Sequence, residues 1–329
     1  QNGSFQVWQR ASAATAQADG EYKTADRWFG WVSGGGAYTT ERSTGNLADT
    51  GHENALKVAV TTADTSIASG DYYAITHRIE AQNLQSLQYG SANAKPVTLS
   101  FWVKATKTGI NTLSLTKDDS TAIRMVKEYT INSSDTWEYK TMTFVPDSSI
   151  KTAASAIVDD NGRGFQLNWV LKYGSTYNGT ADAWTTSSHF TTTNGVNNMD
   201  STSNTFYITG VQLEIGEKAT EFEHEPFETT LSKCHRYYQE VSIGVMYMNG
   251  LETDYFYRSH LLPVKPRATP TIAVHTQFQY YQGGAAANFT PTFGVSGDNL
   301  AHQHVNVYGA SLTNGNGLYT GTFSADAEL

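Results

Sequence analysis

Cysteine is nearly missing from this sequence. Its 329 residues contain one, Cys234, so an internal disulfide and any centre built from clustered thiolates are excluded. The stability of the fold must therefore come from packing or from assembly. Because Cys234 falls on the apolar stripe of a predicted helix, we interpret it as a small buried hydrophobe.

Long apolar runs are missing as well. No segment approaches the roughly 18 consecutive apolar residues of a membrane-spanning helix. The first thirty residues also lack a basic segment followed by an apolar one. We therefore expect no membrane insertion. The sequence begins at Gln1 rather than at a methionine, which leaves open an anchor segment before it.

Basic residues are fewer than acidic ones. The chain has 22 Lys and Arg against 31 Asp and Glu, which gives a formal net charge of -9 and a sequence pI near 5.4. Affinity for phosphate backbones comes from neutralisation by Lys and Arg. Nucleic acid is therefore not expected as a partner.

The signatures of common enzymes are absent too. The sequence has no Walker phosphate loop, no Gly-x-Ser-x-Gly elbow, no His-Glu-x-x-His pair and no EF-hand loop. Paired carboxylates could act as a glycosidase acid and base, and the candidates are Glu214, Glu217, Glu221, Glu223 and Glu225. Clustered at a predicted domain edge, they are interpreted as a solvated acidic face. The sequence therefore predicts that the protein is not an enzyme.

The residues that are abundant favour strands and turns. The chain contains 28 Gly and 19 Tyr and is rich in Thr, Ser and Asn. Alternation is clearest over 97–104, where Val, Leu, Phe and Val face one way and Trp102 lies on the opposite face. Similar short segments recur at 5–8, 55–60, 72–79, 113–115, 137–145, 165–171 and 206–215. We predict an all-β protein whose residues 1–225 form a large jelly-roll-like β-sandwich.

The last of these strands changes phase. Its apolar residues occupy one phase up to Ile208 and the other from Val211 onward, with Gly210 at the change. Both sets can face one core only if the strand is kinked, so we predict a β-bulge at Gly210.

One helix is expected after Pro226. Apolar residues follow at intervals of four and three, at Phe227, Leu231, Cys234, Tyr238 and Val241. This spacing predicts a linker helix over 226–241. Further short strands with proline between them predict a smaller C-terminal β domain over 242–329.

Two segments could hold a metal. The run Asp159, Asp160 and Asn161, followed by Gly162, is typical of a hairpin turn, but its oxygen atoms would also suit calcium. His302 and His304 alternate on a predicted strand and so face the same side. A solvent-facing histidine pair and a metal site at an oligomer axis both remain open. No other cofactor is indicated.

Exposed aromatic residues are the best sign of a binding surface, because a flat ring can stack on the apolar face of a sugar. A long polar connection over 173–204 and a polar loop of the second domain carry the candidates, which are Trp184, Tyr177, Tyr280 and Tyr281. Local packing is the alternative for each of them.

Several motifs carry a resemblance to a known group of proteins. They are Asn2-Gly3-Ser4-Phe5 with Trp8-Gln9-Arg10, Ala25-Asp26-Arg27-Trp28, Leu99 to Ala105, Phe206 to Gly216, Cys234-x-Arg236-Tyr237-Tyr238 and Pro263 to Thr271. With these motifs, nearly the whole chain resembles tailed-bacteriophage virion proteins that contain a jelly-roll domain akin to carbohydrate-binding modules.

The resemblance implies a virion surface location, contact with other virion proteins and a non-enzymatic role. A tail-fibre or adhesion component that contacts host-surface glycan is the leading hypothesis, a capsid decoration protein is its rival, and a polysaccharide depolymerase is a third. The resemblance also implies a homotrimer, whose interface we place on the helix stripe at Phe227, Leu231 and Tyr238. Related modules often hold a structural calcium, and in them Trp102 would be a framework residue.

Overall fold

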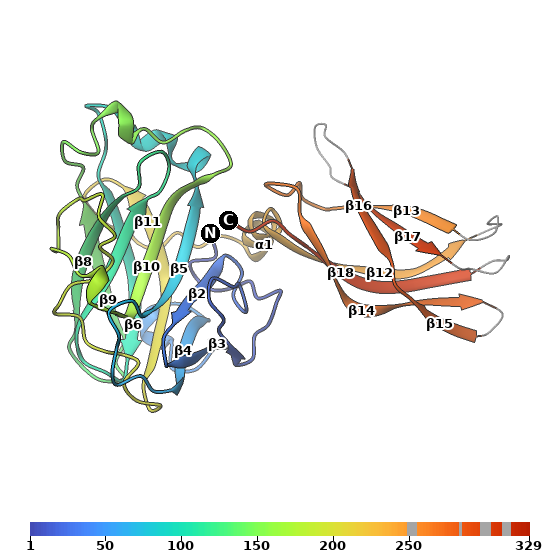
Figure 1. Cartoon of the computed structure of the whole chain (residues 1–329), viewed down its shortest axis with the longest axis horizontal. Coiled ribbons are helices and arrows are strands. Elements are labelled where there is room, and N and C mark those ends of the chain that lie inside the picture. The colour runs from blue at the N-terminus through green and yellow to red at the C-terminus, as the bar shows by residue number, and fades with distance from the viewer. Residues whose placement is uncertain (249–254, 283–284, 297–303, 311–316) are drawn as a thin grey trace. The chain divides into compact units, whose positions relative to one another are not determined.

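The computed structural model describes residues 1–248, 255–282, 285–296, 304–310 and 317–329 (Figure 1). Nearly all of its regular structure is antiparallel sheet, so the all-β prediction is confirmed. The chain forms two compact units, Gln1–Phe227 with Leu329, and Glu228–Glu328. Within the described residues, every helix is too short or too polar to cross a bilayer.

The first unit is a sandwich of two sheets. One sheet has the order β1 (Thr15–Ala16), β3 (Ala37–Ser43), β4 (Ala55–Thr62), β11 (Thr205–Ile215), β6 (Val97–Ala105) and β9 (Glu138–Phe144). The other has the order β2 (Trp28–Ser33), β5 (Tyr72–Glu80), β10 (Arg163–Tyr173), β7 (Gly109–Lys117) and β8 (Ile123–Ile131). Four 3-10 helices lie in the connections between these strands: η1 (Ala48–Thr50), η2 (Ala81–Leu87), η3 (Ala153–Ser155) and η4 (Ser175–Tyr177).

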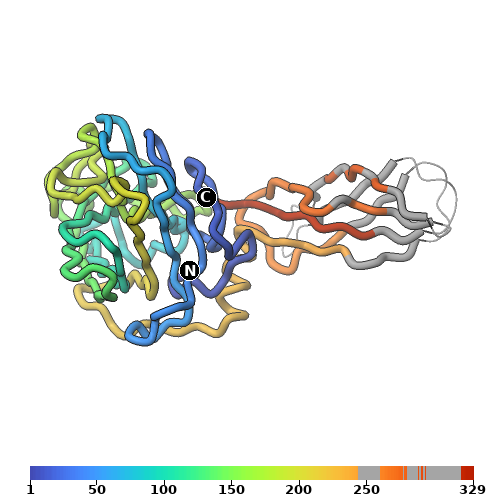
Figure 2. Tube along the Cα trace, turned by 90° about the horizontal axis from the view of Figure 1, so that it is seen from below, coloured from blue at the N-terminus to red at the C-terminus, as the bar shows by residue number. Residues whose placement is uncertain are grey.

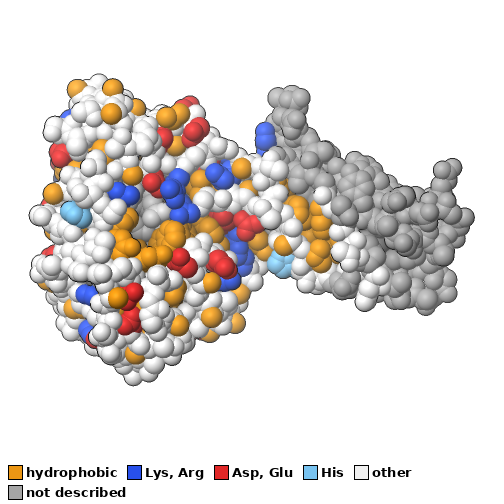
Figure 3. All heavy atoms as spheres, viewed as in Figure 1, with side chains coloured by type: hydrophobic (Ala, Val, Ile, Leu, Met, Phe, Trp, Pro, Cys, Tyr) orange, Lys and Arg blue, Asp and Glu red, His pale blue; other side chains and the backbone are white. Residues whose placement is uncertain are grey.

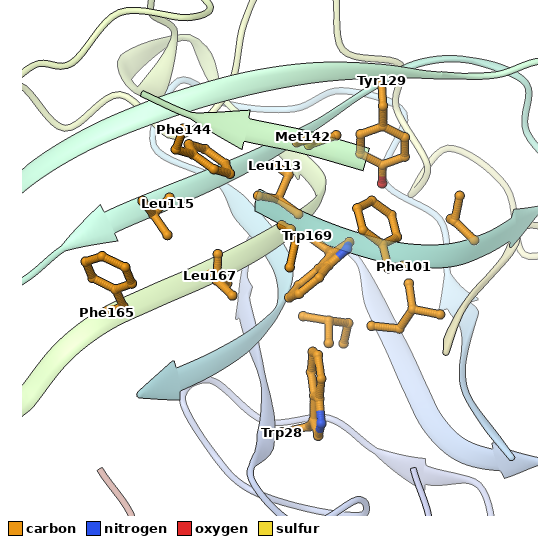
Figure 4. Packing of buried hydrophobic residues seen from close by; sticks show 14 of the residues in the cluster. Trp28, Phe101, Leu113, Leu115, Tyr129, Met142, Phe144, Phe165, Leu167 and Trp169 are labelled. Carbon is orange, nitrogen blue, oxygen red and sulfur yellow. The ribbon is translucent and has the colours of Figure 1, made fainter. Parts of the chain in front are cut away.

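Aromatic rings from both sheets fill the space between them (Figure 4). The ring of Trp169, in β10, lies 5.2 Å from that of Trp28 and 5.6 Å from that of Phe101. Phe101 belongs to the alternating set predicted in β6, whose apolar members are all buried while Trp102 is on the outer face. Truncating such a core ring to alanine typically costs about 3–5 kcal/mol of folding free energy.

The predicted bulge at Gly210 is confirmed. The pairing of β11 with β6 shifts register between Thr209 and Gln212, and Gly210 has a φ of 59°. Ile208 lies in the core, and Val211 packs against the same core after the phase change. The kink thus lets one strand direct both halves of its apolar set inward.

The N-terminal motifs form a buried framework. The Asn2 amide donates to the backbone oxygens of Val7 and Asp26, at 2.9 Å each, and Trp28 Nε1 donates to the Asn2 oxygen at 3.2 Å. The N–H of Val211 donates to the Gly3 oxygen at 2.9 Å. These motif residues therefore hold the N-terminus against β11 and stabilise the fold rather than forming a binding surface.

The helix α1 (Phe227–His235), whose residues after Phe227 belong to the second unit, is shorter than the helix predicted over 226–241. Tyr238 already pairs with Asp326 as the first residue of β12, so the second half of that prediction is wrong. Strand pairing takes up the backbone groups that a longer helix would need.

Two sheets make up the rest of the second unit. The first has the order β12 (Tyr238–Met248), β18 (Gly317–Asp326), β14 (Thr271–Gln282) and β15 (Ala285–Phe289). The second has the order β13 (Tyr255–Leu261), β17 (His304–Ala310) and β16 (Thr292–Ser296). The tube in Figure 2 shows the red C-terminal strand β18 running along this unit. Phe293 lies 5.4 Å from Phe323 and 6.0 Å from Phe278, joining the two sheets in one core.

Candidate functional site

Trp184 is buried, so the expectation that it is an exposed loop aromatic is wrong. Its side chain is 9% exposed and belongs to the core, and its Nε1 donates to the Val145 oxygen at 2.8 Å. The long connection that carries it bridges to β8 through Thr185 and Ala181. An edge strand exposes unpaired backbone groups, and this segment covers them. Trp184 is therefore a structural plug.

Tyr177 does lie on a surface, on the outer face of the five-stranded sheet. Its ring centroid is 5.2 Å from that of Tyr173, and 6.0 Å from those of Tyr72 and Phe190. Trp31 extends the group, with its ring 6.1 Å from Tyr72. We call these five residues, Trp31, Tyr72, Tyr173, Tyr177 and Phe190, the aromatic band. All but the buried Tyr173 are partly exposed.

Strand register explains why the band forms on this face. Trp31 in β2 pairs with Ala74 in β5, and Ala74 pairs with Val170 in β10. These small side chains form a floor, because Ala74 and Val170 are buried beneath the rings of the band. Figure 3, seen from the side of Figure 1, shows hydrophobic side chains gathered near the centre of the first unit, with Lys and Arg side chains beside them.

Two guanidinium groups lie over aromatic rings on the same face. Arg78 is 4.4 Å from the Phe29 centroid and 5.6 Å from that of Trp31, and Arg124 is 4.9 Å from that of Phe190. Burial lowers the pKa of both guanidiniums from its ordinary value. Arginine nonetheless remains a cation in proteins. Arg78 is buried and its Nη1 donates to the Leu329 oxygen, so the partly exposed Arg124 is the group that a ligand can reach.

A series of buried, hydrogen-bonded polar side chains supports Arg78. Arg78 Nε donates to Gln166 Oε1 at 2.9 Å, and Gln166 Nε2 donates to Asn168 Oδ1 at 3.1 Å. Asn168 also binds the hydroxyls of Thr76 and Ser114, at 2.8 and 2.9 Å. Three strands are cross-linked in this way, which makes the face rigid.

Two buried polar atoms beside these side chains lack a hydrogen-bond partner in the described part of the structure. Thr116 pairs with Arg124 in the register of β7 and β8, and the two side chains share the outer face. Among the described residues, neither Thr116 Oγ1 nor Arg124 Nε has a hydrogen-bond partner, although both atoms are buried. Buried polar atoms are ordinarily satisfied, so these two are exceptions on this face.

The hydroxyl groups of the band are fixed in place. The Tyr72 hydroxyl donates to Asp19 at 3.2 Å, and the Tyr177 hydroxyl donates to the Gly70 oxygen at 3.4 Å. Burial, followed by the charge of Asp19, raises the pKa of Tyr72. The Tyr72 hydroxyl therefore stays protonated at neutral pH. Rings oriented in this way lose little freedom when a ligand stacks on them.

Tyr280 and Tyr281 are not in a loop. They lie within β14, where they pair with Ala287 and Ala286 of β15 on one side and with Tyr319 and Leu318 of β18 on the other. The prediction of a polar binding loop at this point is wrong, because β14 continues past both tyrosines to Gln282. Their side chains are outside the described part of the structure.

The metal candidates do not form a cluster. The carboxylate of Asp160 accepts the Gly162 N–H at 2.7 Å, and Asp159, Asp160 and Asn161 are all exposed. The turn precedes β10 but does not join two paired strands, so the hairpin reading is wrong. The described residues include no group of three or more His, Cys, Asp or Glu that could hold a metal. His302 and the side chain of His304 lie outside the described residues.

The three residues of the predicted oligomer interface do not share one exposed surface in the structure. Phe227 is 48% exposed and Leu231 is half-buried, but Tyr238 is 3% exposed and belongs to β12. Tyr238 is therefore removed from any interface by its own chain. Cys234 is buried, in agreement with its interpretation as a small hydrophobe.

Comparisons with known proteins report similarity at the level of structure. No family model matches the chain, and no curated protein matches it. A family 11 carbohydrate-binding module of a cellulosomal cellulase of Clostridium thermocellum is 10% identical, with a TM-score of 0.32, over 65% of this chain and 99% of that one. A putative sugar binding protein from Bacteroides thetaiotaomicron is 12% identical, with a TM-score of 0.36, over 65% and 97%.

A virus protein is also among the similar structures. The enzymatically active domain of tailspike protein 4 of bacteriophage CBA120 is 12% identical, with a TM-score of 0.31, over 65% of this chain and 21% of that one. Any function proposed for this chain therefore has to rest on its own residues.

Proposed function

We propose that this chain is a non-enzymatic bacteriophage virion surface protein that binds host-surface glycan through the aromatic band. One observation carries the proposal: the outer face of the five-stranded sheet presents partly exposed, oriented rings beside two guanidinium groups. Sugar rings have an apolar face and a hydroxyl-rich rim, and this face offers surfaces that complement both.

The arrangement fits a ligand that spans several sugar units. Trp31, Tyr72 and Tyr177 come from β2, β5 and η4. The ring centroids of Trp31 and Tyr72 are 6.1 Å apart, and those of Tyr72 and Tyr177 are 6.0 Å apart. Adjacent rings are nearly perpendicular, at 84° and 85°, so a sugar chain lying along the row would meet ring faces and ring edges in turn. The partly exposed Arg124, over the ring of Phe190, adds a cation on the same face.

The virion setting is supported by the framework motifs. The residues through which the chain resembles phage virion proteins, such as Asn2 and Trp28, are the ones that hold the N-terminus in the first unit. In this setting the protein would contact other virion proteins and assemble as a homotrimer, with the half-exposed Phe227 in the interface.

The binding proposal is tested by screening the purified chain on an array of bacterial surface polysaccharides. Trp31→Ala should weaken binding to any positive glycan by about fivefold or more, because truncating a hot-spot aromatic typically costs more than about 1 kcal/mol. Trp137→Ala is the matched control. It removes a half-buried tryptophan, hydrogen-bonded to the Asn46 oxygen, that lies outside the band. The proposal would be contradicted if both variants lost glycan affinity equally, or if neither variant lost any.

A further inference from the structure

A second candidate site lies on the opposite sheet of the first unit. It is a pocket of about 590 Å³ on the outer face of β6, β9 and β11. Pockets of about 300–1,000 Å³ are the usual size for small-molecule ligands. Nothing in the aromatic band contributes to it, so it is a separate candidate for binding.

Two aromatic side chains form one wall of this pocket. Trp102 in β6 and Tyr139 in β9 are direct partners in the antiparallel register, and their ring centroids are 5.3 Å apart. Tyr139 is 43% exposed and Trp102 is half-buried. Their faces are therefore within reach of a ligand.

The segment after β11 forms the opposite wall. The Glu214 carboxylate accepts the N–H of Thr220 at 3.1 Å and its hydroxyl at 2.5 Å. The Gln212 side chain accepts the Glu223 N–H at 2.8 Å and donates to the Glu221 oxygen at 3.2 Å. These bonds hold the segment in place and direct Phe222 and His224 into the lining.

The inner end of the pocket is closed by His52. It is 8% exposed, its ring is 4.6 Å from Phe222 and 5.4 Å from His224, and its Nδ1 is buried without a hydrogen-bond partner in the described residues. Burial, and then the nearby His224, lower the pKa of His52 to about 4. The imidazole is therefore neutral at neutral pH and adds no charge to the lining.

We propose that this pocket binds a single neutral pyranose ring. The Trp102 and Tyr139 rings would stack on its apolar face, and the exposed Thr220 and Glu221 side chains of the lining would meet its hydroxyl groups. The described lining residues include no Lys or Arg, so nothing there favours an anionic sugar.

The test uses saturation-transfer NMR on the purified chain. The probes are the methyl α-glycosides of glucose, galactose, mannose and N-acetylglucosamine, with methyl glucuronide as a charged comparison. At least one neutral probe should receive saturation and methyl glucuronide should not. Trp102→Ala and Tyr139→Ala should each weaken that binding by about fivefold or more. Tyr139→Phe should preserve it, because the ring is retained.

The variants separate this site from the aromatic band. Trp31→Ala should leave monosaccharide binding unchanged, even if the band binds no polysaccharide at all. If Trp102→Ala fails to fold, Tyr139→Ala decides, because Tyr139 is exposed. The proposal is overturned if none of the four neutral glycosides binds, if glucuronide binds as well as they do, or if Tyr139→Ala binds like the unmodified chain.

Discussion

The imidazole of His52 lies over Gly210 and occupies the space that a side chain at residue 210 would need. Gly210 also has a φ of 59°, in the left-handed region that ordinary side chains avoid. The bulge that turns Val211 toward the core is therefore also the place where His52 enters the pocket of the opposite sheet. Folding and the second site depend on the same glycine.

Gly210→Ala should destabilise the first unit by more than about 2 kcal/mol, since backbone strain of about 1–3 kcal/mol adds to the collision with His52. Gly51→Ala is the matched control. Its φ of 72° lies in the same left-handed region, and the space that an added Cβ would occupy is open, so it isolates backbone strain. Chemical denaturation should rank Gly210→Ala as the more damaging change. Equal effects would show that His52 can move aside without penalty.

Stability should fall as the pH drops from about 6.5 to 4. The pKa of His52 is lowered to about 4 in the folded chain, so between these pH values the unfolded chain binds a proton that the folded chain does not. His77 acts in the same direction, because burial and then nearby positive charge, including Arg27, lower its pKa well below the usual value. Urea denaturation at several pH values measures the slope, and His52→Gln should reduce it.

Protonation of Glu138 should cause a separate loss of folding stability at lower pH. Burial by itself would raise its pKa, but hydrogen bonds from Lys140, Ser133 and Asn132 outweigh burial and lower it to about 2. Its stabilising contribution is present above the ordinary carboxyl pKa and disappears as the pH falls from about 4.5 to 2. Glu138→Gln should flatten the stability curve in that window and leave the His52 window unchanged.

Trp184→Ala should destabilise the first unit by about 3–5 kcal/mol, the usual effect of emptying a buried tryptophan site. The Val145 oxygen would also lose the hydrogen bond from its indole. Thermal melting of this variant and of Tyr177→Ala provides the comparison, because Tyr177 is only half-buried on the outer face. A Trp184→Ala protein that melts with the unmodified chain would contradict the assignment of Trp184 as a plug.

The homotrimer remains a prediction. Phe227 is 48% exposed, so a trimer interface that includes it should be weakened by Phe227→Ala. Light scattering over a range of concentrations measures the mass. A monomeric mass at high concentration in the unmodified chain would exclude the trimer.

Local pattern was enough to predict part of this fold. The alternation around Phe101 and the phase change at Gly210 depend on residues within one strand, so they can be read from the sequence. The burial of Trp184 could not, because it results from a loop that covers the edge of β8, and no local signal shows which edge a loop covers.

The aromatic band was predicted only through Tyr177. Its other members come from strands distant in the sequence, and the pairing of β2, β5 and β10 brings them together. Trp31 and Tyr72 lie out of phase with Trp28 and Tyr73, which face the core, so strand alternation was the signal that could have found them. The rigid polar support under Arg78 requires knowledge of register, which the sequence does not contain.

The central claim is that the aromatic band binds glycan, and titration calorimetry with the best polysaccharide fragment from the array tests it most directly. Tyr177→Ala should lose about fivefold or more in affinity at an unchanged melting temperature, while Trp184→Ala should bind with unmodified affinity per folded molecule. If Tyr177→Ala binds as tightly as the unmodified chain, the band is not the glycan-binding surface.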